Sequence, residues 1–549
     1  MENNEILTAT ESQEIKQETP NYNPPLYQPK PLFSLTKRDT VFAVCVVVAC
    51  IFTAIFGIFG GFAFGYLLSV FLMSALFIIY LAKDGKASVL PILCGILAVL
   101  NSAVFICTTN GSVRFFSVVT SLLSALVFFD GFVNSSSKGN RETLGIFISA
   151  ASTLENIDVA IKSLFSNENG SKKAIGKVLI GLLCALPVLA IVVPLLIASD
   201  DAFRGMMTNI FSNCISTILK TVFGVMLSVL VFTYGLSLKA GRVTKIKRGS
   251  FAGIENIYTI SFLSTISVCY LLYLFSQLAY FFSAFKGFLP NGEITYAEYA
   301  RKGFFEMCII AVINLCLVFL ALLLAKKENG KVCNTVKAIT TFISVFTLLI
   351  IATAISKMVL YIDAYGMTVL RLTTSAFMLF LAITFISAIL RIYTTKINII
   401  KTALITAGCI TLILGVTNVN AVCAKYNYEA YRLNKLETID IEAIYDLGDE
   451  GIPYIVKLGA SKDKDVAIDA QQYLAKAYLY DYFDNMESAD FFLVEELREN
   501  QKDKGFERFS IPKSKAYDML YKFIEKNPQF ADNCQELYNE LNQEYIYEY

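Results

Sequence analysis

The sequence predicts an all-α, polytopic membrane protein with about eleven transmembrane helices and a helical C-terminal domain outside the bilayer. Of its 549 residues, 55% are hydrophobic and only 17% are charged, whereas soluble domains carry about 25% charged residues. Long apolar segments recur along residues 39–418. Each is long enough to cross a bilayer as a helix that rises about 1.5 Å per residue.

Charge divides the chain into three regions. Residues 1–38 are polar and rich in Glu, Asn and Pro, which is typical of a disordered tail. Residues 419–549 contain 26 acidic and 15 basic residues, whereas the rest of the chain contains 20 and 32. We therefore expect a transmembrane domain over 39–418 and an acidic helical domain over 419–549. Within the latter, 441–458 resembles a helix pair of a solenoid, although no clear repeat period is visible.

Eleven apolar segments are predicted to span the membrane. They are residues 41–59, 63–82, 88–108, 113–133, 176–198, 219–240, 257–285, 303–325, 337–360, 373–393 and 397–417. The loops between these segments form two alternating sets, one with 23 Lys and Arg residues and the other with 8. The set with 23 is expected in the cytoplasm. The N-terminus is therefore predicted to be cytoplasmic, and an odd number of spans places the C-terminal domain on the other side. One span more or fewer would reverse that last assignment.

Residues 144–165 are predicted to form an amphipathic helix on the inner membrane surface instead of a span. Apolar residues such as Leu154, Ile157 and Ile161 recur at helical spacing, while Asp158 and Lys162 occupy the other face. This pattern is typical of helices that lie in the plane of the membrane interface.

Composition excludes several kinds of chemistry. The chain has no histidine, which excludes Ser-His and Cys-His nucleophile pairs and His-Glu-x-x-His metal sites. It also has no phosphate-binding loop of the form G-x-x-x-x-G-K-[ST] and no C-x-x-C pair. Most of the 13 cysteines lie in apolar segments, so they are interpreted as small buried side chains. The sequence thus predicts no metal, no cofactor and no nucleic-acid partner, and it favours a non-enzymatic role.

Three polar motifs occur at helix ends that the predicted orientation places on the outer side. They are Ser199–Arg204, Thr295–Glu306 and Lys357–Arg371. A charge at the bilayer centre costs about 2.5–3.5 kcal/mol, so charged residues near span ends should face protein or water and pair with opposite charges. The alternative interpretation is that the tyrosines anchor at the headgroup level and the charges form surface pairs, worth about 0–1 kcal/mol each.

The working hypothesis combines the three motifs in one outward-facing polar site. In the third motif, Lys357, Tyr361 and Tyr365 are spaced to share one helix face. Tyrosines and cations would bind an anionic or sugar-like group, and carboxylates would pair with the cations or relay protons. The candidate residues are Asp200, Asp201, Tyr296, Glu298, Tyr299, Arg301, Glu306, Lys357, Tyr361, Asp363, Tyr365 and Arg371.

The chain also resembles a known family of bacterial multi-pass membrane proteins. Tyr296–Glu306, Tyr361–Arg371 and Asn418–Asn427 are similar to the signatures of domain-of-unknown-function family 4173, which is related to the 4153 group. The resemblance covers about residues 180–460. It implies a bacterial origin and a cytoplasmic-membrane location, and it implies no established activity.

A transport or cell-envelope-associated role is the first functional hypothesis, with membrane lipids and a small ligand or an envelope protein as partners. The first alternative is a membrane enzyme that acts on a lipid-linked substrate at the outer face, with Asp200 or Asp201 as its base. Multi-span glycosyltransferases usually carry acidic residues in the first outer loop. The loop at Gly60 and Gly61 is uncharged here, which argues against that class of enzyme. The second alternative is a non-catalytic scaffold whose outer domain docks partners.

Overall fold

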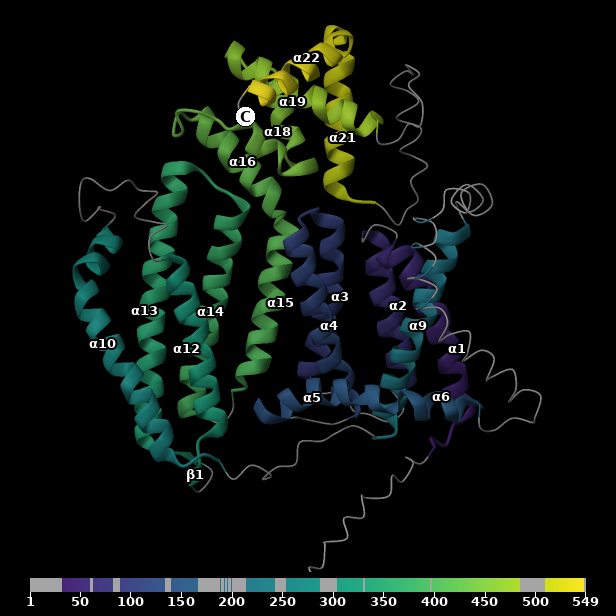
Figure 1. Ribbon diagram of the computed structural model, residues 1–549, viewed down its shortest axis with the longest axis vertical. Coiled ribbons are helices and arrows are strands. Elements are labelled where there is room, and N and C mark those ends of the chain that lie inside the picture. The colour runs from purple at the N-terminus through teal and green to yellow at the C-terminus, as the bar shows by residue number, and fades with distance from the viewer. Residues whose placement is uncertain are drawn as a thin grey trace, which may run out of the picture.

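The chain forms a bundle of long helices from which a smaller helical domain extends (Figure 1). The computed structural model describes residues 32–59, 63–81, 89–133, 140–165, 214–241, 253–286, 304–328, 331–394, 397–483 and 509–547, with isolated positions between 188 and 199. The long helices are α1 (Lys37–Phe52), α2 (Phe64–Leu81), α3 (Val89–Cys107), α4 (Gly111–Val133), α9 (Cys214–Lys239), α10 (Asn256–Lys286), α12 (Phe304–Leu324), α13 (Asn334–Tyr365), α14 (Val369–Tyr393) and α15 (Ile399–Thr417).

Shorter elements connect these helices. A π-helix, η1 (Thr53–Ile58), continues α1. A two-residue antiparallel hairpin, β1 (Lys327–Glu328) and β2 (Lys331–Val332), links α12 to α13. The predicted helical class is therefore confirmed for the described residues.

Eleven helices among the described residues are long and apolar enough to cross a membrane. Ten of them match predicted spans. The eleventh, Thr143–Ser163, is instead the segment that we interpreted as amphipathic, whereas the predicted span 176–198 lies almost wholly outside the described residues. The structure thus has eleven candidate spans, as many as predicted, but one candidate differs from the predicted set.

The amphipathic segment is made of α5 (Asn140–Ser152), the 3-10 helix η2 (Thr153–Asn156) and α6 (Ile157–Phe165). Figure 1 shows that α5 and α6 run across the long helices at the bottom of the bundle. Asp158 and Lys162 form an exposed ion pair with an N–O distance of 3.3 Å, while Val159 and Ala160 are buried. One face of α6 thus packs on the bundle and the other is polar, as expected of an amphipathic helix, although the length and mean hydropathy of Thr143–Ser163 resemble those of a span.

The end of the bundle next to α6 is held together by a buried carboxylate. Asp39 is only 2% exposed and accepts hydrogen bonds from Lys239 Nζ and from the Tyr80 hydroxyl, both at 2.7 Å. The backbone N–H and the hydroxyl of Thr36 also donate to it, at 2.8 and 2.7 Å. These contacts join α1, α2 and α9. The first residues of α1 lie at the end of the bundle opposite the C-terminal domain (Figure 1).

Among the described residues, the bundle has two large hydrophobic cores. One is built mainly from α1–α6 and α9, and the other from α10 and α12–α14. In the second core, the buried Asn314 side chain accepts from the Tyr270 hydroxyl at 2.5 Å and donates to Thr347 Oγ1 at 2.9 Å. These two hydrogen bonds join α10, α12 and α13. Polar contacts of this kind stabilise helix pairs in lipid.

Helix α15 lies between the two cores and packs closely on α3. A Cβ at Gly408 would lie 2.6 Å from Leu97 Cδ2, and one at Gly415 would lie 2.3 Å from Val104 Cγ1. The close approach also lets the buried Asn101 amide donate to the Gly408 carbonyl at 3.2 Å. Small residues at such interfaces allow helix backbones to approach within the membrane.

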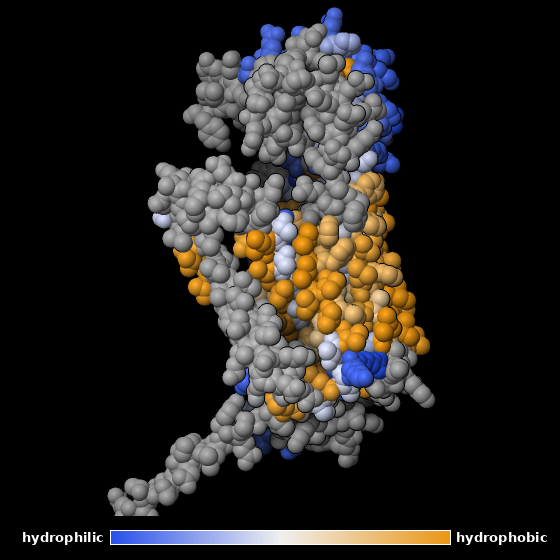
Figure 2. Space-filling view, turned by 90° about the vertical axis from the view of Figure 1, so that its right-hand side faces the viewer, coloured by the Kyte–Doolittle hydropathy of each residue, from blue (hydrophilic) through white to orange (hydrophobic). Residues whose placement is uncertain are grey.

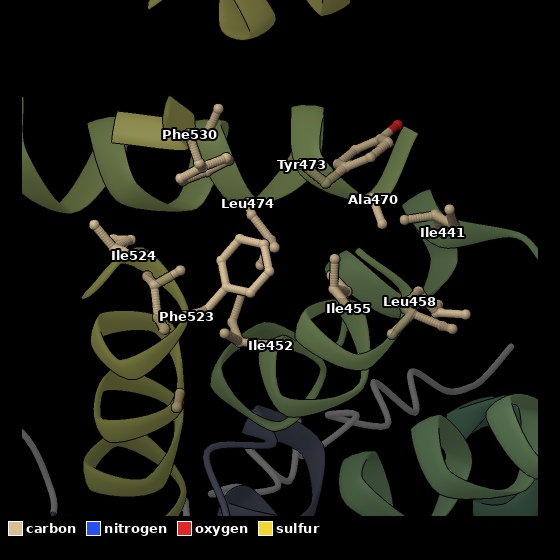
Figure 3. Packing of buried hydrophobic residues seen from close by; sticks show 14 of the residues in the cluster. Ile441, Ile452, Ile455, Leu458, Ala470, Tyr473, Leu474, Phe523, Ile524 and Phe530 are labelled. Carbon is tan, nitrogen blue, oxygen red and sulfur yellow. The ribbon is translucent and has the colours of Figure 1, made fainter. Parts of the chain in front are cut away.

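The C-terminal domain has its own core. It contains α16 (Val419–Arg432), α17 (Ile441–Tyr445), η3 (Gly448–Glu450), α18 (Ile452–Leu458), α19 (Lys464–Phe483), α21 (Ile511–Lys526) and α22 (Pro528–Tyr547). Ile455, Leu474 and Phe523 are among its buried residues (Figure 3). Figure 2 shows a hydrophobic band over the bundle and hydrophilic residues on this domain. The solenoid-like arrangement of its helices stays a prediction.

Candidate functional site: the junction between bundle and C-terminal domain

Polar residues concentrate where the C-terminal domain meets the bundle. Two loops of the bundle take part: residues 108–110 join α3 to α4, and residues 366–368 join α13 to α14. They contact α16 and η3, and we call residues 105–114, 363–371, 418–427 and 447–450 the junction. Figure 1 shows these segments together at the top of the bundle.

The α13–α14 loop is held by local contacts of Arg371. Gly366 ends α13 with a φ of +76°, a conformation that favours glycine. Arg371 Nη1 donates to the carbonyls of Tyr365 at 3.0 Å and of Gly366 at 2.5 Å. The guanidinium carbon lies 4.0 Å from the centroid of the Tyr361 ring, within the range of cation–π attraction. Among the described residues, backbone carbonyls and a ring, and not a carboxylate, thus contact this arginine.

The same loop forms a reciprocal pair with Asn427 of α16. The Met367 N–H donates to Asn427 Oδ1 at 2.8 Å, and Asn427 Nδ2 donates to the Met367 carbonyl at 2.9 Å. A Cβ at Gly366 would lie 2.7 Å from Asn427 Oδ1. Glycine is therefore required both by the backbone conformation and by the space that Asn427 occupies.

A second contact of α16 with α13 involves Tyr426. Its hydroxyl forms a hydrogen bond with Asp363 near the end of α13. Burial, followed by the negative charge of Asp363 and by this hydrogen bond, raises the pKa of Tyr426 above its usual value. Tyr426 thus links α16 to the end of α13.

The α3–α4 loop is held by the carboxylate of Glu450, which is 3% exposed. Glu450 accepts from the Thr109 N–H at 2.8 Å and from the Thr109 hydroxyl at 2.5 Å. Arg114 donates through Nε to the Thr108 carbonyl at 2.8 Å, and its charge attracts Glu450 and Asp449. A buried carboxylate is costly unless it is paired and hydrogen-bonded, and these partners supply that compensation.

Asn418 and Asn420 complete the junction where α15 passes into α16. Asn418 adopts a φ of +58° between the two helices, and its Nδ2 donates to the Cys107 carbonyl at 2.8 Å. Asn420 donates to the Leu447 carbonyl at 2.9 Å and accepts from Asn110 Nδ2 at 2.8 Å. Short polar side chains tolerate positive φ better than most residues do, so asparagine suits this turn.

The structure describes six of the twelve candidate residues. Tyr361 and Tyr365 pack edge to face with centroids 5.4 Å apart, as their shared helix face predicts. Lys357 lies one turn further from the junction, and Glu306 is exposed in the first turn of α12. The remaining six candidates lie outside the described residues: Asp200, Asp201, Tyr296, Glu298, Tyr299 and Arg301.

Sequence reasoning missed the residues that join the two parts of the chain. Asn418, Asn420 and Asn427 belong to a motif that carried the family resemblance, but their partners lie far away in the sequence. Glu450 resembles an ordinary surface carboxylate in the stretch Gly448–Gly451. Among the described residues, no group of three or more Cys, Asp or Glu side chains could hold a metal ion.

A family model described as Domain of unknown function (DUF4153) matches residues 67–458. The chain belongs to this family. The match to DUF4153 begins earlier than the resemblance that the motifs indicated, and membership of the related group 4173 stays a prediction. Every junction segment lies inside the matched region, whereas α19, α21 and α22 lie outside it. No curated protein and no solved structure matches the chain.

Proposed function

We propose that this DUF4153 protein has a transport or cell-envelope-associated role in which the C-terminal domain and the membrane bundle act as one coupled unit. The observation that carries the proposal is the pair of attachments made by Asn427 and Glu450. They connect the C-terminal domain to two separate helix hairpins, α13–α14 and α3–α4. A partner or ligand that displaces the domain would therefore displace both hairpins.

Helix α15 makes this coupling direct. It leads into α16 with only Asn418 between them, and it packs between the two cores of the bundle. Displacing α16 therefore acts on three helices at once: on α14 through Met367, on α4 through the 108–110 loop, and on α15 through the chain itself. The attachments by Asn427 and by Glu450 each have at least two hydrogen bonds. Such contacts favour defined positions of the C-terminal domain on the bundle over a continuous range of positions.

The expected topology belongs to the same proposal. The N-terminus would be cytoplasmic and the C-terminal domain extracytoplasmic, in a bacterial cytoplasmic membrane. Support comes from the excess of Lys and Arg in alternate loops and from the positions of α1 and the C-terminal domain at opposite ends of the bundle (Figure 1). Binding to the C-terminal domain on the envelope side would then displace helices within the membrane.

The polar site of twelve residues remains part of the transport hypothesis for its undescribed members. For the third motif, the junction role has the better support, because Arg371 Nη1 already donates to two backbone carbonyls. A scaffold role is the second candidate function. It is favoured by the separate core of the C-terminal domain (Figure 3), since a folded domain presents a fixed surface to partners.

Pulsed dipolar spectroscopy tests the coupling. Spin labels would replace Leu122 on α4 and Leu379 on α14, which are 58% and 50% exposed, after exposed native cysteines are changed to serine. The full-length protein with an intact junction should give one narrow distance distribution. Combining Asn427→Ala with Glu450→Ala should broaden or shift it, and Lys425→Ala on the exposed face of α16 should not. An unchanged distribution in the double variant would refute coupling.

A test in cells addresses the role itself. The double variant should reach the membrane at normal abundance and reproduce the envelope or uptake defect of a strain that lacks the protein. If the double variant restores normal behaviour to that strain, the coupled unit is not needed for the function.

A further inference from the structure

A groove of about 650 Å³ lies between α4, α14 and α15. Its lining extends from Ser112 and Leu370, in the first turns of α4 and α14, to Phe147 of α5 and Ile400 of α15. Along α15 the lining reaches from Ile400 to Leu414, a length of about 21 Å at 1.5 Å per residue. The groove therefore follows the helices through much of the bilayer's apolar thickness.

The lining offers no charge and few free polar groups to a ligand. None of its residues is Asp, Glu, Lys or Arg. Its threonines donate to carbonyls of their own helices: Thr120 to Phe116 at 2.8 Å, Thr373 to Val369 at 2.8 Å, Thr374 to Leu370 at 2.7 Å and Thr411 to Ala407 at 2.8 Å. A polar solute would lose its hydration without gaining these donors. The lining thus excludes ions and sugars and suits hydrocarbon.

The surroundings point to the same occupant. All three walls are helices that are long and apolar enough to span a membrane. Phe116, Leu370 and Phe377 of the lining are 58%, 62% and 41% exposed, so the groove opens on an apolar face that suits lipid better than water. An empty groove would deprive its lining of dispersion contacts, and a volume of several hundred cubic ångströms is in the range of ligand sites. Phe116, Phe377 and Phe380 add broad apolar surface along its walls.

We propose that this groove binds one hydrocarbon chain of a bilayer lipid. The chain lies between α4 and α14 and against α15, where it completes the packing between the two cores of the bundle. This inference deepens the proposed function, because its three walls are the helices whose ends the junction holds. The ligand of the coupled unit in this groove is then a lipid.

Photo-cross-linking of the full-length protein tests this proposal. The probe is a phosphatidylglycerol with a diazirine in one acyl chain, mixed into phosphatidylethanolamine nanodiscs, with cross-linked peptides identified by mass spectrometry. We expect cross-links concentrated on the groove residues of α4, α14 and α15. Cross-links spread evenly over the lipid-exposed faces of all helices would overturn the proposal.

Substitutions that fill the groove supply the second arm. Ala407→Phe, or the smaller change Ala403→Leu, should abolish the groove cross-links. Ile413→Phe is the matched control, because Ile413 lies on α15, is 60% exposed and does not line the groove. Unchanged cross-linking in both filled variants would also overturn the proposal. The spin-label distances between α4 and α14 in the junction variants are measured without reference to the groove, so failure of this inference is distinguishable from failure of the coupling.

Discussion

Replacing Asn427 with alanine tests the junction at one defined point. The change removes both hydrogen bonds between the Asn427 side chain and the Met367 backbone, which measure 2.8 and 2.9 Å. Each hydrogen bond contributes about 0.5–1.5 kcal/mol net, so the free energy of opening this contact should fall by about 1–3 kcal/mol. That range corresponds to about a 5- to 150-fold change in the opening equilibrium.

Hydrogen exchange followed by mass spectrometry measures this opening directly. The Met367 N–H is protected by Asn427 Oδ1, and exchange reports local opening free energies. Peptides containing Met367 should exchange faster in Asn427→Ala by the factor given above. Asn427→Asp, which keeps the acceptor and loses the donor, should have a smaller effect. Lys425→Ala on the same helix serves as the control.

An unchanged exchange rate at Met367 in Asn427→Ala would contradict this role of Asn427. That result would mean that the loop is held in place without the asparagine, by Arg371 and Gly366 alone. Faster exchange in the Lys425→Ala control would point instead to general loosening of α16.

Four further predictions concern Glu450, the buried cysteines and Asn314. Glu450→Ala should weaken protection of the Thr109 amide by about 1.5–3 kcal/mol, because its bond to a charged acceptor is lost; unchanged exchange there would contradict it. Burial raises the pKa of the Cys423 and Cys534 thiols from 9.0 to about 12, so both should resist maleimide at pH 8 until the protein unfolds. Because these folded-state pKa values are raised, the stability of the C-terminal domain should fall as pH rises from about 9 towards 12, which circular dichroism can follow. Asn314→Ala should lower bundle stability by about 0.6–1.7 kcal/mol, measured by thermal unfolding in detergent against Cys316→Ala, an exposed position on α12.

Hydropathy predicts most of the bundle because a long apolar run in a membrane has almost no alternative to a helix. It does not separate a span from an amphipathic helix of similar length. Residues 143–163 show this, since charge placement at Asp158 and Lys162 indicates the surface orientation while mean hydropathy resembles that of a span. The break after the first span is also visible in the sequence at Gly60 and Gly61, and α2 begins soon after it, at Phe64.

The junction could be predicted only in part, because its contacts join residues far apart in the chain. Arg371 and Gly366 lie close enough in sequence for a turn to be expected between them. The partner of Met367 is 60 residues away, and the partner of Thr109 is 341 residues away. No local pattern encodes such pairs. Glu450 in particular differs from a surface carboxylate only through burial, which is a property of the tertiary structure.

The groove was hidden from sequence reasoning for a related reason. Its lining consists of ordinary small and apolar residues that any span contains, drawn from four helices. Only their relative placement creates the space. Polar motifs, which attracted attention in the sequence, lie at the helix ends and contribute little to its walls.

Native mass spectrometry of lipid retained by the purified protein tests most directly whether the junction controls the helices that line the groove. We expect the double variant Asn427→Ala and Glu450→Ala, which leaves every groove residue unchanged, to retain less lipid than the parent protein and than Lys425→Ala. Equal lipid retention in all three proteins would contradict the claim.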